Sequence, residues 1–461
     1  MSQGALAATA PYERSSTSGW LRWAPLAVLA ALAAIALGAG LDRWRGASSR
    51  GPLDPALLHA GYGASNFAAV RERSEQVVYS ARQSVARYPG EWLREEGLAR
   101  ALMGRWRLTG NYADLAEADR LLDTALARTP DPAGPVLTRA LLSIEVHRLE
   151  EAERALARFR RSVVPDDGDR ADAEALTGDI AMQRGELDEA ARHFARAAQI
   201  AGTPGIGLRG ALLASRRDDN LSAKRALEAL LAKPRQPPAL LAELALQRAN
   251  IAYAEGDWDG ATSWVAAARR VFKGYWLADA YAAQNEAIAG HSSAAIAKYE
   301  ELARRTSRPE VMDALAHLLR LQGQPIESKA WAARAAAGWR ANAALFPEAV
   351  AQHYAEHELA VGSAARALTL AQADVAGRPQ WPGIALLGRA LVLEGRPREA
   401  LAQIALAERQ GWRSAGLFML KADAQTALGD QAGADASRAR ALAINPRAAD
   451  PRIRLIWFGH D

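Results

Sequence analysis

The chain has 461 residues, of which half are apolar and 24% are charged, with a net charge of +5 at pH 7. This balance is typical of a folded chain and excludes intrinsic disorder for most of it. The absence of cysteine excludes disulfides, cysteine nucleophiles, zinc ribbons and iron–sulfur clusters. Because the positive charge is mild and spread along the chain, we expect no nucleic-acid partner.

The N-terminal region contains a long apolar run. Residues 1–19 are small and polar and are expected to form a disordered tail. From Trp23 to Leu41 no residue is charged, and as a helix this run would rise about 28 Å, enough to cross a bilayer core. Tryptophan and arginine residues flank it on both sides, as is common at membrane interfaces. We therefore expect a single transmembrane anchor at residues 20–41.

A cleaved signal peptide is the alternative interpretation, since the small residues Ala36, Gly38 and Gly40 suit a signal peptidase. The arginines on the two sides are nearly balanced and give little orientation bias. The short N-terminal tail and the signal-like layout favour a bacterial inner-membrane protein that passes the membrane once and has its large C-terminal part in the periplasm. Under the alternative, the protein is secreted to the periplasm after cleavage.

Residues 42–66 are rich in glycine, serine and proline and are expected to be a linker. A helix is expected over residues 67–89, where Val77, Val78 and Val85 precede Pro89. This helix is expected to pack on the first repeat that follows.

A repeated spacing of small residues dominates the rest of the chain. A small residue is followed by glycine after seven positions, by alanine or serine after five more, by a usually large residue after four, and by a mostly small residue after three. Clear copies include Gly178, Gly185, Ala190, Phe194 and Ala197. Six such copies occur in total, and the glycines that carry the period are Gly185, Gly256, Gly290, Gly323, Gly362, Gly395 and Gly429.

This pattern resembles the tetratricopeptide repeat family, whose unit has about 34 residues. The resemblance implies an all-α, tetratricopeptide-type solenoid of helical hairpins at residues 67–446, with about ten units, preceded by the single transmembrane helix. The glycines are expected to stop first helices in the left-handed conformation. The small mid-helix residues are expected to let paired helices approach closely.

The last residues, 447–461, are expected to form a C-terminal cap or tail. Leu455, Ile456, Trp457 and Phe458 make this segment apolar. Folding back on the last repeat is the simpler interpretation, and anchoring a partner is the alternative.

One short motif is typical of inverted zinc peptidases. His353, Glu356 and His357 match H-x-x-E-H, and helical spacing places both imidazoles on one face. However, the peptidase family with this motif has a third ligand, a glutamate, some seventy residues later, and no glutamate follows Glu408. We expect a structural role, no cofactor and no metal site, and a zinc-dependent hydrolase remains the unfavoured alternative.

In the resembled family, first-helix residues line a concave groove. The positions mapped to a partner groove here are Asp179, Asn250, Tyr253, Gln284, His317, Arg320, Glu356 and Arg389. These side chains include acidic, basic, amide and aromatic groups, so they do not indicate a particular class of ligand.

Together, these features favour a non-enzymatic, membrane-tethered scaffold that binds a protein or peptide and helps assemble or mature a bacterial envelope complex. A self-associating structural protein is a further alternative. The sequence does not define the oligomeric state.

Overall fold

The computed structural model describes residues 53–162 and 165–459. The expected disordered tail at 1–19 and the expected transmembrane segment at 20–41 lie outside the described residues. None of the helices within the described ranges combines the length and the apolar character needed to cross a membrane.

Helices make up nearly all the regular structure of the described ranges, and the one β feature there is an isolated bridge between Asn66 and Lys273. The prediction of an all-α fold is confirmed. In chain order the helices are η1 (Pro55–Leu57), α2 (Phe67–Arg87), α3 (Trp92–Thr109), α4 (Tyr112–Arg128), α5 (Val136–Glu145), α6 (Leu149–Phe159), α7 (Asp167–Gln183), α8 (Leu187–Ile200), α9 (Pro204–Arg216), α10 (Asn220–Leu231), α11 (Pro238–Ala254), α12 (Trp258–Val271), α13 (Trp276–Ile288), α14 (Ser292–Thr306), α15 (Pro309–Leu321), α16 (Pro325–Ala343), α17 (Pro347–Val361), α18 (Ala364–Gly377), α19 (Trp381–Leu393), α20 (Pro397–Arg409), α21 (Ala415–Ala427), α22 (Gln431–Ile444) and η2 (Pro451–Leu455).

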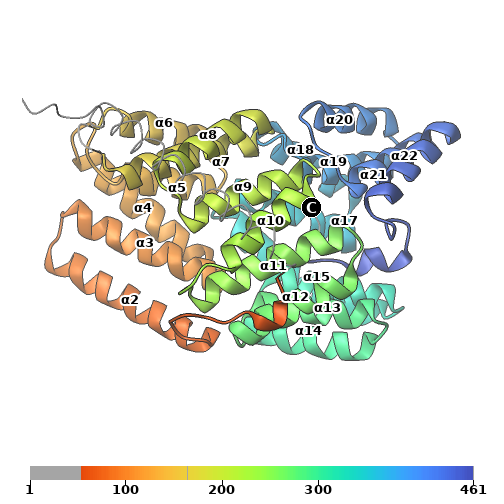
Figure 1. Ribbon diagram of the computed structural model, residues 1–461, viewed down its shortest axis with the longest axis horizontal. Helices are drawn as coiled ribbons and strands as arrows, with labels where there is room; N and C mark the ends of the chain where they lie inside the picture. Colours follow the sequence, from red (N-terminus) through yellow and green to blue (C-terminus); the bar gives the residue numbers. More distant parts are fainter. Residues whose placement is uncertain (1–52, 163–164, 460–461) are drawn as a thin grey trace, which may run out of the picture. The chain divides into compact units, whose positions relative to one another are not determined.

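The helices from α3 to α22 pair as consecutive antiparallel hairpins, beginning with α3 and α4 and ending with α21 and α22. Each hairpin also touches the next, because the second helix of one contacts the first helix of the following one. Several first helices also contact one another directly, as in α5 to α7 and α17 to α19 to α21. Figure 1 shows this progression from α2 to α22. The predicted helical-hairpin solenoid is therefore what the chain forms.

The repeat glycines mostly act as predicted. Six of the seven have a positive φ, among them Gly185 at 74° and Gly429 at 79°, where a side chain would be strained. Gly362 is the exception, because its φ is −116°. The buried carboxylate of Glu358 accepts a hydrogen bond from the Ser363 backbone N–H at 2.9 Å, so α17 ends in a different way.

Close helix approach at small residues is also observed. A Cβ atom at Gly178 in α7 would lie 2.5 Å from the ring of Phe194 in α8. This is the contact that the repeat spacing predicts between a small first-helix residue and the bulky second-helix residue. Replacing Gly178 by a larger residue would push the two helices apart.

Side-chain caps fix where several helices begin. The Asp166 side chain accepts from the Asp169 backbone N–H at the start of α7, and Thr203 does the same for α9 and Ser414 for α21. Such caps satisfy backbone donors that the first helical turn leaves unpaired.

Hairpins far apart in sequence pack together. One buried cluster joins Leu102 of α3 and Leu122 of α4 to Trp339 of α16, and another joins Phe194 of α8 to Ile404 of α20. Gly185 lies so close to Gln410 that a Cβ would fall 2.3 Å from its amide nitrogen. Early and late repeats are therefore held to one another by apolar packing.

The segment before α2 packs on the middle of the array. The Gly61 backbone N–H donates to the Gln236 carbonyl at 2.9 Å, and the Lys273 N–H donates to the Ser65 carbonyl at 2.9 Å. The described part of the expected linker thus lies against residues between α10 and α13.

Candidate protein-binding groove

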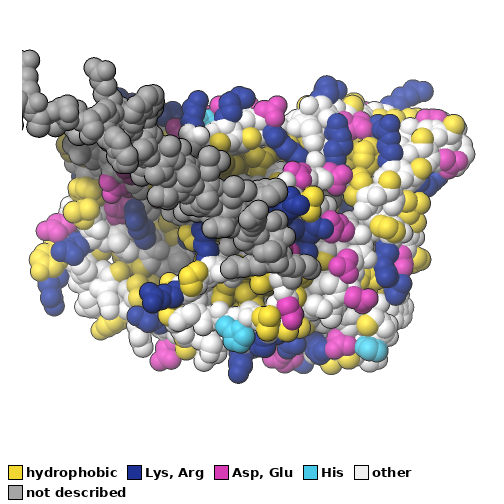
Figure 2. Space-filling view, in the orientation of Figure 1, with side chains coloured by type: hydrophobic (Ala, Val, Ile, Leu, Met, Phe, Trp, Pro, Cys, Tyr) yellow, Lys and Arg dark blue, Asp and Glu magenta, His cyan; other side chains and the backbone are white. Residues whose placement is uncertain are grey.

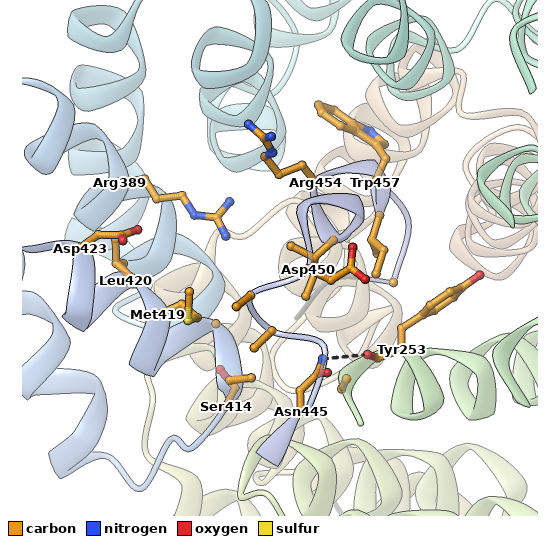
Figure 3. A pocket seen from close by; sticks show the side chains of 18 of the residues that line it. Tyr253, Arg389, Ser414, Met419, Leu420, Asp423, Asn445, Asp450, Arg454 and Trp457 are labelled. Atoms are coloured by element: carbon orange, nitrogen blue, oxygen red, sulfur yellow. Dashed lines mark hydrogen bonds between the residues drawn. The ribbon is translucent and has the colours of Figure 1, made fainter. Parts of the chain in front are cut away.

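First helices supply most of the lining of a large cavity of about 790 Å³. Leu386 and Val392 of α19 and Met419 of α21 give it an apolar wall, while Ile456 and Trp457 of the C-terminal segment line it too. Figure 3 shows Arg389 and Met419 on one side and Tyr253 and Trp457 on the other. We call the surface formed by α11, α13, α15, α17, α19 and α21 the inner groove.

The structure brings five of the eight predicted groove residues into this cavity. They are Tyr253, His317, Arg320, Glu356 and Arg389. They come from four first helices of the array, namely α11, α15, α17 and α19. They line the same cavity because equivalent positions of stacked first helices share one face.

Charges of both signs face the cavity. Arg320 and Arg389 are exposed, and within the described ranges neither forms an ion pair with a carboxylate, unlike the paired arginines elsewhere on the array. Burial raises the pKa of Asp423, which also lines the cavity, although Arg438 and Arg389 oppose this. Figure 2 shows basic and acidic side chains interspersed on the visible face.

The C-terminal segment lies in the inner groove beside this cavity. Gln284 of α13 is completely buried, and its Oε1 accepts from the backbone N–H groups of Trp457 at 2.7 Å and Phe458 at 2.8 Å. Its Nε2 donates to the Phe458 carbonyl at 3.1 Å. His317 of α15 adds a hydrogen bond from Nε2 to the Arg454 carbonyl at 2.9 Å.

Aromatic side chains hold the same segment. The Phe458 ring lies 5.8 Å from Tyr281 and 6.5 Å from Tyr299, measured between centroids, and only 8% of Phe458 is exposed. The Trp457 ring lies 5.4 Å from the His317 ring. Burying an aromatic ring of this kind contributes roughly 2–3 kcal/mol.

The start of the segment is fixed by separate contacts. Asn445 Nδ2 donates to the Tyr253 carbonyl at 3.3 Å (Figure 3). The guanidinium carbons of Arg447 and Arg452 lie 4.5 and 4.7 Å from the ring centroid of Trp258, which is a cation–π arrangement. Residues 445–452 are thereby attached to α11 and α12.

These contacts correct one sequence-based interpretation. The sequence favours a tail folded back on the last repeat, yet its described hydrogen bonds to helices and its ring contacts go to α11, α12, α13, α14 and α15. The reason is chemical, because Gln284 and the tyrosines of the middle repeats offer backbone hydrogen bonds and an aromatic pocket. The apolar character of the tail indicates burial but does not indicate that Gln284 and Tyr281 are its partners.

The remaining predicted groove residues are engaged by other groups. Asn250 accepts a hydrogen bond from the Tyr281 hydroxyl at 2.7 Å and lies against Gly459. Asp179 of α7 pairs with Arg209 at 2.7 Å, away from the cavity lining. Burial raises the pKa of Asp179, while its hydrogen bond and charge interaction with Arg209 oppose this.

In the H-x-x-E-H motif, His353 Nδ1 lies 3.8 Å from Glu356 Oε2, while His357 pairs with a different carboxylate. His357 is buried, and its Nδ1 lies 2.6 Å from Asp313 Oδ1, while Trp339 Nε1 donates to Asp313 Oδ2 at 2.7 Å. His353 instead stacks on Trp339 with 5.8 Å between centroids. Across the described ranges, no three histidine, aspartate or glutamate residues are arranged to hold a metal ion.

Comparisons with known proteins give only structural neighbours. No protein-family model matches the chain, and no curated protein matches it in sequence. A tetratricopeptide repeat protein from Parabacteroides merdae is 15% identical, with a TM-score of 0.34 over 55% of this chain and 98% of that one. The P58(IPK) TPR domain is 16% identical, with a TM-score of 0.26 over 84% and 94%. A monomeric mutant of IFIT1 with Gppp-AAAA is 13% identical, with a TM-score of 0.39 over 76% and 90%.

Proposed function

We propose that this chain is a scaffold that binds a segment of a partner protein in the inner groove. The observation that carries this is the cavity of about 790 Å³ whose wall is built by several successive first helices. Ligand pockets typically have about 300–1,000 Å³, so this one suits a few side chains of a peptide segment. A rigid groove of stacked helices binds such a segment with little ordering cost to itself.

The lining favours a segment with both apolar and charged side chains. Leu386, Val392 and Met419 offer apolar contact, while Arg320 and Arg389 are cations without a described carboxylate partner. An acidic side chain next to an apolar one would satisfy both features.

The cellular setting is part of the proposal. Residues 20–41 would anchor the chain in a bacterial inner membrane, with the repeat array in the periplasm, where it would help assemble or mature an envelope complex. The support for this is the uncharged run from Trp23 to Leu41.

Site-specific crosslinking in cells tests the proposal. A photo-crosslinking amino acid at Leu393, which lines the cavity and is 64% exposed, is expected to capture one dominant protein. Arg389→Glu should reduce that product at least fivefold. The matched control is the same probe at Ile326, which is 80% exposed but is not part of the lining. Equal products from both positions, or a product insensitive to Arg389→Glu, would contradict the proposal.

A further inference from the structure

We infer that residues 452–459 are an internal ligand of the inner groove, and that a partner segment with the same backbone path and with an aromatic residue followed by glycine displaces them. The inference rests on the proposed function, since it names the chemistry of the partner segment and the way in which the groove is regulated. It concerns the part of the groove over α13 to α15, next to the cavity.

The hydrogen bonds that seat the tail are directed at its backbone. Gln284 accepts two backbone N–H groups and donates to one carbonyl, and His317 donates to another carbonyl. None of these four bonds uses a side chain of the tail. Any segment with the same backbone path, a 3-10 turn like η2 followed by an extended stretch, can therefore make them.

Specificity comes from one side-chain pocket. Phe458 enters between Tyr281 and Tyr299 and is the one fully buried side chain of residues 452–459. Ile453, Leu455, Ile456 and Trp457 are only half-buried. The pocket thus selects a single aromatic ring, and the neighbouring positions tolerate different bulky residues.

The position after the aromatic residue is restricted to glycine. Gly459 has a φ of +77°, and a Cβ there would lie 2.2 Å from Asn250 Oδ1 and 2.8 Å from the Tyr281 hydroxyl. Both the backbone conformation and the space exclude other residues. A competing segment of the same path needs an aromatic residue followed by glycine.

The tail is attached so that its end can leave alone. Asn445, Arg447 and Arg452 fix the start of the segment to Tyr253 and Trp258, so the residues that follow Arg452 can open from this attachment. Since residues 452–459 bury one ring and cover a groove that remains built without them, local opening requires no helix to unfold. Because the tail is tethered, its effective concentration at the groove is high. A partner segment must therefore bind the groove more tightly than the tail does in order to displace it.

The test uses the full chain in detergent and a fluorescein-labelled peptide with the sequence of residues 451–461. Phe458→Asp removes the tail from its pocket, so this variant should bind the peptide at least tenfold more tightly than the unmodified chain. A second Gln284→Ala change should abolish that binding. Tyr79→Asp is the matched control, because Tyr79 is an aromatic residue 67% exposed on α2, and it should behave like the unmodified chain.

Several results would overturn the inference. They are equal peptide binding by the unmodified and Phe458→Asp chains, binding that survives Gln284→Ala, and a concentration-dependent dimer that Phe458→Asp dissociates, which would make a second copy the occupant. If Phe458→Asp does not fold, hydrogen exchange of the unmodified chain decides. The amides of residues 452–459 should exchange at least 100-fold faster than those of α13, and equal protection would show a permanent plug. Crosslinking at Leu393 is independent of these results, so a failed peptide test with intact crosslinking rejects only the internal ligand.

Discussion

The side-chain amide of Gln284 forms hydrogen bonds with both the backbone N–H and the backbone carbonyl of Phe458, although 174 positions separate the two residues in the sequence. The side chain donates to the Phe458 carbonyl at 3.1 Å and accepts its N–H at 2.8 Å. A completely buried amide at a groove position is thereby satisfied by the chain's own backbone. The inner groove thus holds a segment of the chain's own tail, and this relationship gives the most direct set of tests.

Replacing Gln284 by leucine should loosen the tail without unfolding the helices. Three hydrogen bonds disappear and two backbone N–H groups lose their acceptor, which costs the seated form about 1–3 kcal/mol. Hydrogen exchange of residues 452–459 should accelerate by roughly tenfold or more. Gln372→Leu on α18, an exposed glutamine, is the control and should leave the tail unchanged. Unaltered exchange in Gln284→Leu would show that these bonds do not hold the tail.

Tail release should increase in acid. Burial lowers the pKa of His317, Arg320 lowers it further, and the bond to the Arg454 carbonyl opposes this. Release of the tail removes part of this burial, so the released form binds a proton more readily. The contribution of His317 to holding the tail is therefore complete above the pKa of the released form and is lost as the pH falls through the lower pKa of the bound form. Exchange corrected for intrinsic rates should be faster at pH 5.5 than at pH 7.5. His317→Gln should remove this difference, and a difference that persists would assign it to another group.

Gly459→Ala should destabilise the seated tail, because Asn250 and Tyr281 occupy the space and φ is positive. The left-handed conformation alone costs a non-glycine residue roughly 1–2 kcal/mol. The control is Gly97→Ala in the interior of α3, where nothing lies within 4 Å and where alanine should stabilise the helix by about 0.5–1 kcal/mol. Thermal unfolding and tail exchange measure the two effects. If Gly459→Ala changes neither thermal unfolding nor the exchange of the tail, position 459 does not require glycine.

Asp313 should be important for stability and not for metal binding. Asp313→Ala leaves the buried His357 and Trp339 donors without their acceptor and is expected to cost about 3 kcal/mol in unfolding free energy. Denaturant unfolding measures this. A chelator should leave the melting temperature of the unmodified chain unchanged. A chelator-induced drop of several degrees, lost in His357→Ala, would instead identify a metal site.

The periodic spacing of small residues predicted the fold because each position has a local cause. Gly185 and Gly429 adopt the left-handed conformation that stops a helix, and Gly178 admits the Phe194 ring. The prediction of a left-handed conformation at Gly362 was wrong. The Glu358 side chain accepts a hydrogen bond from the Ser363 backbone N–H at the end of this helix, and the spacing of glycines does not indicate such an interaction. Residue identity alone did not reveal that difference.

The candidate site was predicted in part for the same reason. Tyr253, His317 and Arg389 share a face because stacked repeats are equivalent, and periodicity reports this. The binding site of the tail depends on a contact between Gln284 and Phe458, and nothing in a repeat pattern links positions so far apart. Such contacts follow from how the array curves, which accumulates over many hairpins.

The most direct test of the groove as a binding surface is to identify what contacts Met419, which lines the cavity. A photo-crosslinker at this position, followed by mass spectrometry of the joined peptides, should yield one continuous segment from one partner protein, and Arg389→Glu should abolish it. Many unrelated segments, or the same set of products as a crosslinker at Ile326, would contradict the account.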